Sequence, residues 1–464
     1  MRGECYCHAV VQVGRAARLC VASLCLGACA ADPPSLPSGG TDGSGTASTA
    51  TESAAATTTD DGADASSTAA STDGPTTDAT GVMLPVALTL DIAIVVDNTL
   101  GNGAAQARLA QAMDGLVAGL RATTVDLDVH VVLTTPDFGN PACTRFQPAG
   151  YAPALGAPQA RTCRDHLSDF TSLSGSVQMP EVCEQVCPEG TVLPGQVLAF
   201  TLDGSNVEGA TIEDALRCLV PQGINGCGFE STLRAATTLV DPTQCWNDPA
   251  CTEGGQTFLR PEADLAVIVM TDELDCSLGD PELTADQGYW TVDPSTGQPA
   301  LSSAICFTVG AACEGPDASG TFTNCSATAD GNMLLVEEIV QRLVVANPNK
   351  HVTFVPIVGY DEAGPAMTEY RTWREGEWPA GDLTPEQVAQ GETAAYQDHV
   401  YGLGPGCVGM SRLGGWTQGI APIRIREVCE TVDDADNGDC CPASVCGDFD
   451  AAMQCLVDRA TSAG

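Results

Sequence analysis

The stretch LDIAIVVDNTLG, residues 90–101, places a run of apolar, mostly β-branched residues directly before Asp97 and Asn98. A short apolar run that ends in polar turn residues is typical of a strand buried on both faces of a sheet. Apolar residues at helical spacing follow over 104–120, and alternating apolar and polar residues then mark a second strand over 127–134. Strand, loop, helix and strand in this order predict an α/β fold.

The rest of the chain repeats this theme. Three further helices are predicted, over residues 229–239, 333–345 and 448–459. Two further strands are predicted, over 265–270 and 352–358, and Pro356 places the second of them nearer an edge of the sheet. The long cysteine-bearing stretches, at about 136–225, 276–330 and 360–421, are predicted to be insertions between core elements.

Composition and charge narrow the function. The 464 residues are 44% apolar and 17% charged, which is globular composition. Lys and Arg number 19 against 60 Asp and Glu, so the formal net charge is −41, and Lys350 is the only lysine. Nucleic-acid binding needs clustered basic residues, so this balance counts against it. An acidic surface instead favours cations or basic partners.

The cysteines indicate an exported chain. Five of the 23 lie in the first 29 residues, and the other 18 run from Cys143 to Cys455. An even set of this size outside the cytosol predicts disulfides, up to nine of them. Zinc would prefer paired C-x-x-C knuckles, and the sequence contains none.

The N-terminus predicts a lipoprotein. Basic residues precede a short apolar run over 19–28, too short to span a bilayer and typical of a signal peptide, residues 1–28. The run ends in Leu26-Gly27-Ala28-Cys29, which resembles the lipobox of bacterial lipoproteins. That resemblance implies lipidation of Cys29 and, with Ala30 next, an outer-membrane envelope protein whose only membrane contact is this lipid. The alternative is ordinary cleavage at Ala30, followed by secretion.

Residues 29–84 form a predicted tether. They are almost wholly Ser, Thr, Ala, Gly, Pro and Asp, with eight acidic residues and no basic one. Such a segment buries too little apolar surface to offset its chain entropy, so we expect a disordered, self-repelling linker. The folded domain is therefore expected over 85–464.

Two segments resemble a known family. The 91–101 stretch is similar to the first strand and metal loop, D-x-S-x-S, of von Willebrand factor type A domains, and Thr271-Asp272-Glu273 is similar to the end of a later strand. More narrowly, the cysteine-rich frame resembles type A lipoproteins of delta-type, myxobacteria-like bacteria. The resemblance implies a doubly wound, mainly parallel sheet with helices on both faces and a metal-ion-dependent adhesion site at the carboxyl ends of its strands.

The same resemblance implies ligands for a divalent cation, Mg²⁺ or else Ca²⁺ or Mn²⁺. Asp97, Thr99 and Asp272 match the family's metal-binding positions, and Glu230 is the candidate for another oxygen. Gly101 stands where a second hydroxyl belongs, so the metal site is expected to be degraded. Hard divalent cations take oxygen ligands of these kinds.

The predicted function is binding of a protein or glycan, without catalysis. The loops 97–103, 226–231 and 272–277 should meet at one edge of a parallel sheet. Their acidic residues form the expected ligand face: Asp97, Glu230, Asp272, Glu273 and Asp275. Two alternatives remain, a metal-free structural envelope lipoprotein and an unrecognised secreted hydrolase, although the sequence has no H-E-x-x-H, G-x-S-x-G or P-loop motif.

Overall fold

A computed structural model describes residues 86–251, 257–280, 283, 303–328, 332–374, 377, 394–410 and 416–463. The predicted signal peptide, Cys29 and the tether lie outside the described residues. Within those ranges no helix is long and apolar enough to cross a bilayer.

The core elements alternate along the chain. Its strands are β1 (Val86–Val96), β2 (Thr124–Thr134), β3 (Leu198–Thr201), β4 (Asp264–Met270), β7 (Val352–Val358), β10 (Gly438–Cys440) and β11 (Ala443–Ser444). Its helices are α1 (Gly103–Thr123), α3 (Ile212–Leu219), α4 (Thr232–Leu239), α6 (Val336–Val340), α9 (Ile423–Asp433) and α10 (Asp450–Ala463). The remaining elements are α2 (Glu181–Glu184), α5 (Ala304–Gly310), β5 (Ala311–Glu314), β6 (Thr323–Ala327), α8 (Ala394–Tyr401), β8 (Pro405–Met410) and β9 (Trp416–Ile420).

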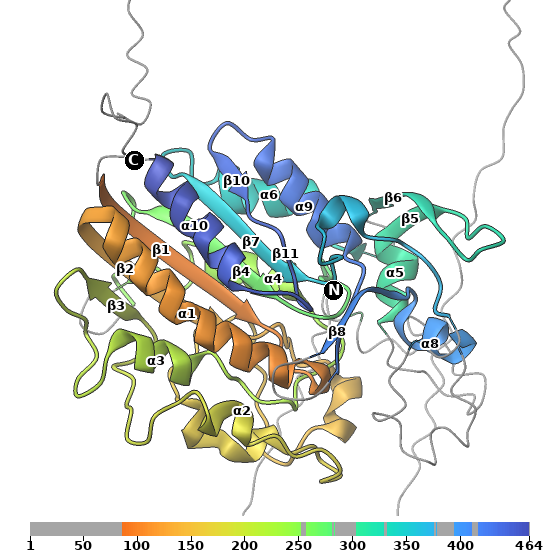
Figure 1. The fold of residues 1–464 in the computed structure, drawn as a ribbon, viewed down its shortest axis with the longest axis horizontal. Coiled ribbons are helices and arrows are strands. Elements are labelled where there is room, and N and C mark those ends of the chain that lie inside the picture. Colours follow the sequence, from red (N-terminus) through yellow and green to blue (C-terminus); the bar gives the residue numbers. More distant parts are fainter. Residues whose placement is uncertain are drawn as a thin grey trace, which may run out of the picture. The chain divides into compact units, whose positions relative to one another are not determined.

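The centre of the fold is a seven-stranded, mostly parallel sheet (Figure 1). Its order is β10-β7-β4-β1-β2-β3, and β11 also pairs with β7. All pairs are parallel except β2 with β3, which is antiparallel. The prediction of an α/β fold with a mainly parallel sheet is confirmed.

Helices cover both faces of the sheet because β1 is apolar on both sides. Leu90, Ile92, Ile94 and Val96 pack into a core shared with α1, α3 and α10. Ala93 and Val95 face the opposite way, into a core shared with α4, α6 and α9. Successive side chains of a strand point to opposite faces, so an unbroken apolar run is what two covering layers require.

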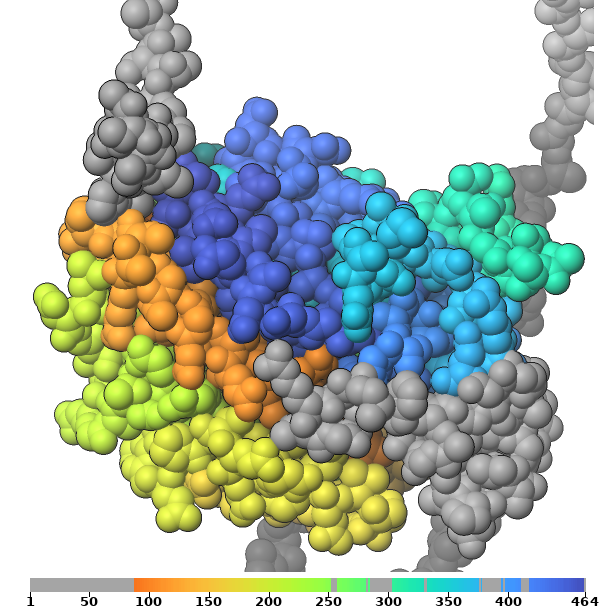
Figure 2. All heavy atoms as spheres, in the orientation of Figure 1, coloured from red at the N-terminus to blue at the C-terminus, as the bar shows by residue number. Residues whose placement is uncertain are grey.

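The stretch 136–225 is more than an insertion, which corrects the sequence prediction. It contains β3, the antiparallel edge strand, and α3, which packs against α1 beside the sheet. Figure 2 shows part of this stretch, in yellow, packed along one end of α1, in orange. Both elements are short, and their apolar signal is diluted by the surrounding cysteine-rich loops.

Strand β7 tolerates a proline although it lies inside the sheet, next to the edge. Pro356 pairs with Val269 on β4, and all seven β7 residues are buried. On its other side, β10 pairs with 352–354 and β11 with 357–358. Pro356 therefore falls at the gap between two short partner strands, where its missing N–H breaks no ladder.

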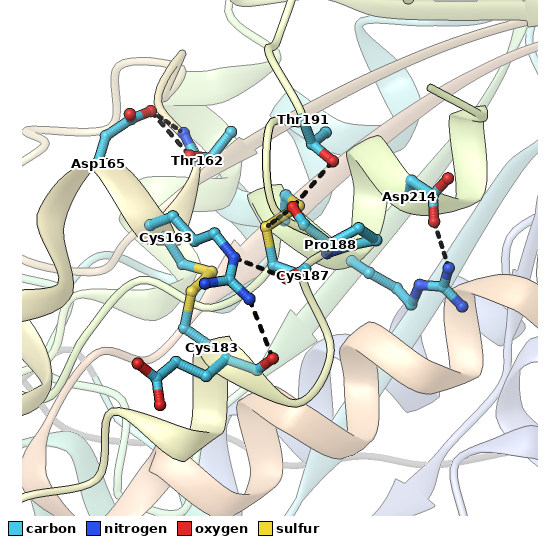
Figure 3. Close-up of a disulfide and its surroundings, with 12 residues drawn as sticks. Thr162, Cys163, Asp165, Cys183, Cys187, Pro188, Thr191 and Asp214 are labelled. Carbon is cyan, nitrogen blue, oxygen red and sulfur yellow. Dashed lines mark hydrogen bonds and ion pairs between the residues drawn. A yellow bond between two sulfur atoms is a disulfide. The ribbon is translucent and has the colours of Figure 1, made fainter. Parts of the chain in front are cut away.

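Disulfides hold the long loops, as the cysteine count predicted. Eight are formed: 143–227, 163–183, 187–218, 276–306, 313–325, 407–446, 429–440 and 441–455. In Figure 3 the Cys163–Cys183 bond lies against Cys187, and the three sulfur atoms are within 4.8 Å of one another. The nearby turn at Thr162 and Asp165 is closed by hydrogen bonds of 2.8 and 3.0 Å. These thiols are oxidised, so they are not a metal site.

Candidate functional site

The topology places a switch point where β1 and β4 end side by side, and we call this place the β1–β4 crevice. From β1 the chain passes through α1 to β2 on one side, whereas β4 lies on the other side. Ligands bind in open α/β sheets where such connections diverge, outside the carboxyl ends of the strands. Val96 pairs with Met270, and the Asp97 N–H donates to the Met270 carbonyl at 2.9 Å. Asp97 and Thr271 therefore leave neighbouring strands at the same level.

Asp97 is fully buried and accepts four hydrogen bonds. One carboxylate oxygen accepts from the Thr99 N–H at 2.8 Å and from the Thr99 hydroxyl at 2.7 Å. The other accepts from Asn102 at 2.5 Å and from Thr271 at 2.8 Å. The predicted pair Asp97 and Thr99 is thus in direct contact at the base of the crevice.

Asn102 joins two of the acidic residues. Its side-chain amide donates to Asp97 and to Asp272, each at 2.5 Å. Asn102 occupies the N-cap of α1, where an asparagine normally accepts a hydrogen bond from the first helical turn. Here it makes no capping bond, and its Oδ1 is buried without a partner. The Asn102 side chain therefore binds the two carboxylates and does not cap the helix.

Thr271 joins Asp97 to Glu230. Its hydroxyl lies 2.8 Å from an Asp97 oxygen and 2.6 Å from Glu230 Oε2. A hydroxyl carries one hydrogen, so it donates to only one of these groups. Burial, and then the negative charge of Asp97, raise the pKa of Glu230 well above its usual range. Glu230 is therefore the carboxyl that carries a proton and donates to Thr271, while its other oxygen, Oε1, is buried without a partner.

Asp272 and Glu273 stand at the partly exposed mouth of the crevice. Burial, and then the charges of Asp97 and Glu273, raise the pKa of Asp272 well above its usual range. Burial and the charge of Asp97 raise the pKa of Glu273 to about 8, although a hydrogen bond with Ser303 acts in the opposite direction. We call Asp97, Glu230, Asp272 and Glu273 the acidic cluster.

No described basic residue forms an ion pair with the acidic cluster. Elsewhere the fold does compensate buried acids: Asp91 lies 2.8 Å from Arg260 and 3.5 Å from Lys350, the one lysine of the chain. Buried charges without partners are costly, which accounts for the raised pKa values of Glu230, Asp272 and Glu273.

Asp275 does not join the cluster. It is buried in an ion pair with Arg424 at 3.0 Å, and the Leu233 N–H at the start of α4 donates to it at 3.0 Å. The Ser277 hydroxyl donates to the same oxygen at 2.6 Å. The structure thus gives Asp275 a role in joining α4 to α9 rather than a place on the ligand face.

The three predicted loops do meet. The Gly226 N–H donates to the Asn98 carbonyl at 2.8 Å, and the Cys276 N–H donates to the Glu230 carbonyl at 2.7 Å. The β8–β9 hairpin borders the same place, since the Ile420 N–H donates to the Asp272 carbonyl at 2.7 Å. A side chain at position 226 would place its Cβ 2.2 Å from Asn98 Oδ1, so this close approach requires glycine.

Gly101 leaves room for Asp272. A Cβ at position 101 would lie 2.5 Å from Asp272 Oδ2, closer than real Cβ atoms come. Glycine at position 101 therefore lets the Asp272 carboxylate lie beside Asn102.

The carboxyl groups are linked through the side chains of Asn102 and Thr271, and their oxygens do not surround one common point. Among the described residues, the only three acidic, histidine or cysteine side chains with all donor atoms within 4.8 Å are the disulfide-bonded cysteines 163, 183 and 187. Asn102 and Thr271 stand between the acidic groups, and the sequence analysis assigned no role to either. Asn102 could have been suspected from its position between two glycines before a helix, and Thr271 from its place directly after a buried strand.

Three histidines lie in other surroundings. Their ring nitrogens lie 3.1 Å from the Thr257 carbonyl for His130, 3.2 Å from Asp169 for His166 and 3.0 Å from Asp439 for His351.

Comparison with known proteins does not assign the chain. No protein-family model matches it, and no curated protein matches it.

Proposed function

We propose that residues 85–464 are a von Willebrand factor type A domain that binds a protein or glycan through a divalent cation in the β1–β4 crevice. The observation that carries the proposal is the acidic cluster, which has no basic partner and includes the buried, unpartnered oxygen Glu230 Oε1. The sheet order and the convergence of three loops on the crevice support it.

The residues present are suited to a hard cation. Asp97, Asp272 and Glu230 offer carboxylate oxygens, and Thr99 offers a hydroxyl. Asn102 offers a second unpartnered oxygen, Oδ1, which rotation of its amide would turn toward Asp97 and Asp272. A bound cation would neutralise the cluster and leave a coordination position for an oxygen of the partner. Because the site lacks a second hydroxyl, we expect weaker binding than in an intact site.

A metal-free structural domain is the second candidate, and one observation favours it. The Asn102 amide already bridges Asp97 and Asp272, and the Thr271 hydroxyl already bridges Asp97 and Glu230. An amide and a retained proton can satisfy a carboxylate cluster without a cation. This version of the domain would have a structural role and would not bind a partner through a cation.

Titration calorimetry and thermal shift with Mg²⁺, Mn²⁺ and Ca²⁺ separate the two candidates. The cation-dependent domain binds at least one of these ions and gains thermal stability, because an ion that binds only the folded state stabilises it. Asp272→Asn keeps the size of the side chain and removes one charged ligand, so affinity should fall at least about tenfold, or about 1.4 kcal/mol.

Asp126→Asn is the matched control. Asp126 is exposed on β2, so its replacement makes the same change of charge away from the crevice and should leave cation binding unaltered. Equal losses of cation affinity in both variants would show that the effect comes from the overall charge of the protein. No response of the wild-type protein to about 10 mM of any of the three ions would leave the metal-free candidate.

Partner binding is tested separately, on glycan arrays and on purified envelope proteins, with and without a chelator. The proposal expects binding that a chelator abolishes and that Asp272→Asn weakens in parallel with the cation. Binding that survives both changes would place the ligand face elsewhere.

A further inference from the structure

Two of the eighteen cysteines in the domain stand outside the disulfide framework. Cys245 and Cys251 are unpaired and exposed. Each of the eight disulfides, in contrast, includes at least one buried cysteine. In a chain expected to be exported, two exposed thiols are chemically unusual, because oxidising compartments convert thiols to disulfides.

The loop between α4 and β4 brings the two thiols together. The Asp248 N–H donates to the carbonyls of Gln244 at 3.1 Å and of Cys245 at 3.3 Å, and the Cys251 N–H donates to the Asp248 carbonyl at 3.0 Å. These successive turns fold the segment back on itself, and the Cys251 and Cys245 side chains are hydrogen-bonded to each other. Trp246 anchors the loop, since its indole N–H donates to the Leu239 carbonyl at 2.9 Å.

We propose that Cys245 and Cys251 form a surface thiol–disulfide couple, which exchanges with thiols and disulfides of the cell envelope while the eight other disulfides remain closed. Small-molecule disulfides and envelope oxidoreductases are the co-reactants by class. The couple is independent of the cation site proposed above.

The exchange balances as two successive attacks. The first thiolate attacks a sulfur of the external disulfide, forms a mixed disulfide and releases one external thiolate. The second cysteine then attacks the protein sulfur of the mixed disulfide, closes the Cys245–Cys251 bond and releases the second external thiolate. Two electrons pass from the cysteines to the external disulfide, and the two protons of the cysteine thiols go to the released thiolates.

Cys245 is the attacking residue in this order. The hydrogen bond with Cys245 is the largest of the effects that raise the pKa of Cys251 to about 11, so Cys251 is almost wholly protonated near neutral pH. The thiolate is the nucleophile in exchange, which disfavours Cys251 in the first step. Its Sγ also lies 3.9 Å from the Asp248 carboxylate, whose charge further opposes ionisation.

Two features separate this couple from the other eight bonds. The first is access, because both sulfurs are exposed to solvent and to partners. The second is loop length. The couple closes a loop of six positions, whereas the existing disulfides span 11 to 84. A short loop restricts the unfolded chain least, so its bond adds least to folding and is easiest to lose.

Peptide mapping after differential alkylation tests the couple in the whole chain. After incubation with oxidised glutathione, the 245–251 pair should be closed; on titration with dithiothreitol it should open at a concentration at least about tenfold lower than any other pair. Simultaneous opening of several pairs, failure of the pair to close, or a disulfide-linked dimer on a non-reducing gel would overturn the proposal.

Single serine variants test the order of attack. Cys251→Ser leaves Cys245 able to form a mixed disulfide with glutathione, seen as one added glutathione in the intact mass. Cys245→Ser keeps a hydroxyl that can accept the hydrogen bond from the Cys251 thiol, so it should react at least about tenfold more slowly. Equal rates would overturn the assignment of Cys245. The double variant serves as the control: it should lack the most easily reduced pair and keep the melting temperature of the wild type.

Discussion

At the residue scale, the crevice is organised by groups that are not acidic. Asn102 and Thr271 each contact two carboxyl groups, and together they link three of them in a chain from Glu230 through Asp97 to Asp272. The four hydrogen bonds to Asp97 fix the centre of this chain. The proposed cation would have to displace the Asn102 amide and the Glu230 proton, which would lower its affinity.

Gly101 gives the sharpest single-residue prediction. Gly101→Ala should push the Asp272 carboxylate out of its place, because the new Cβ would lie 2.5 Å from Oδ2. We expect cation affinity, measured by calorimetry, to fall at least about tenfold, which is about 1.4 kcal/mol.

Gly115→Ala is the matched control for this change. Gly115 lies on α1 with no atom within 4 Å of its Cβ position, so alanine there should raise the free energy of unfolding by about 0.5–1 kcal/mol and leave cation binding intact. Unchanged cation binding in Gly101→Ala would show that the space beside Gly101 does not govern Asp272.

The raised pKa values predict how stability depends on pH without divalent cations. The folded chain holds the Glu273 proton up to about pH 8, whereas the ordinary pKa is 4.5, so folding binds protons in this window. The free energy of unfolding should be highest below about pH 4.5 on this account and should fall as the pH rises toward 8. Glu230 and Asp272 act in the same direction.

Urea denaturation in a chelator at pH 5 and pH 8 measures this fall. Glu273→Gln cannot ionise, so its stability should decline less between the two pH values than that of the wild type. A wild-type protein that is equally stable at both pH values would show that these carboxyl groups are not held protonated by the fold.

At the element scale, the longer strands β1, β2, β4 and β7 could be predicted from sequence, whereas the short strands β3, β10 and β11 and the connections could not. The largely apolar stretch 90–96 and the unbroken apolar run 265–270 predicted β1 and β4, and parallel pairing then placed Asp97 beside Thr271 and Asp272. A run of apolar residues predicts such a strand because a strand covered by helices on both faces must be apolar on both sides.

The features that could not be predicted from sequence depend on contacts between segments that are far apart in the chain. The strand β3 has four residues, and Asp275 pairs with Arg424 across 149 positions of sequence. Neither a short edge strand nor a long-range ion pair leaves a periodic local signal. The prediction from sequence therefore placed Asp275 on the ligand face with its acidic neighbours, whereas in the structure Asp275 forms an ion pair with Arg424.

The Asp275–Arg424 pair predicts a stability effect without a ligand-binding effect. Both side chains are buried, with exposed fractions of 0% and 4%, and Asp275→Ala would leave Arg424 charged without a carboxylate partner. Breaking a buried pair from one side costs about 3–5 kcal/mol. Urea denaturation should show this loss, while cation binding by the remaining folded protein stays the same.

Glu338→Gln provides the comparison for that variant. It breaks the exposed pair of Glu338 with Arg342 on the α6 surface, which should change stability by less than about 0.5 kcal/mol. A similarly small effect for Asp275→Ala, or a loss of cation binding without a loss of stability, would return Asp275 to the ligand face.

At the scale of the whole molecule, the covalent cross-links agree with the predicted export from the cytosol. A net charge of −41 repels other acidic surfaces, so we expect the proposed partner to bring basic groups or to bind through a cation. Eight disulfides fix loops that the sheet alone does not hold. A reducing cytosol would open such bonds, which agrees with the signal peptide expected from the N-terminal sequence.

The last prediction concerns attachment. If Cys29 carries lipid, Cys29→Ala should move the protein from the membrane fraction to the periplasm or medium, because a chain with 60 Asp and Glu against 19 Lys and Arg should not be attracted to anionic lipid. Fractionation with antibody detection measures the shift, and Cys25→Ala, four positions upstream within the predicted signal peptide, is the control. A Cys29→Ala protein that stays in the membrane fraction would exclude the lipid anchor, and release of both variants would point to failed export signals instead.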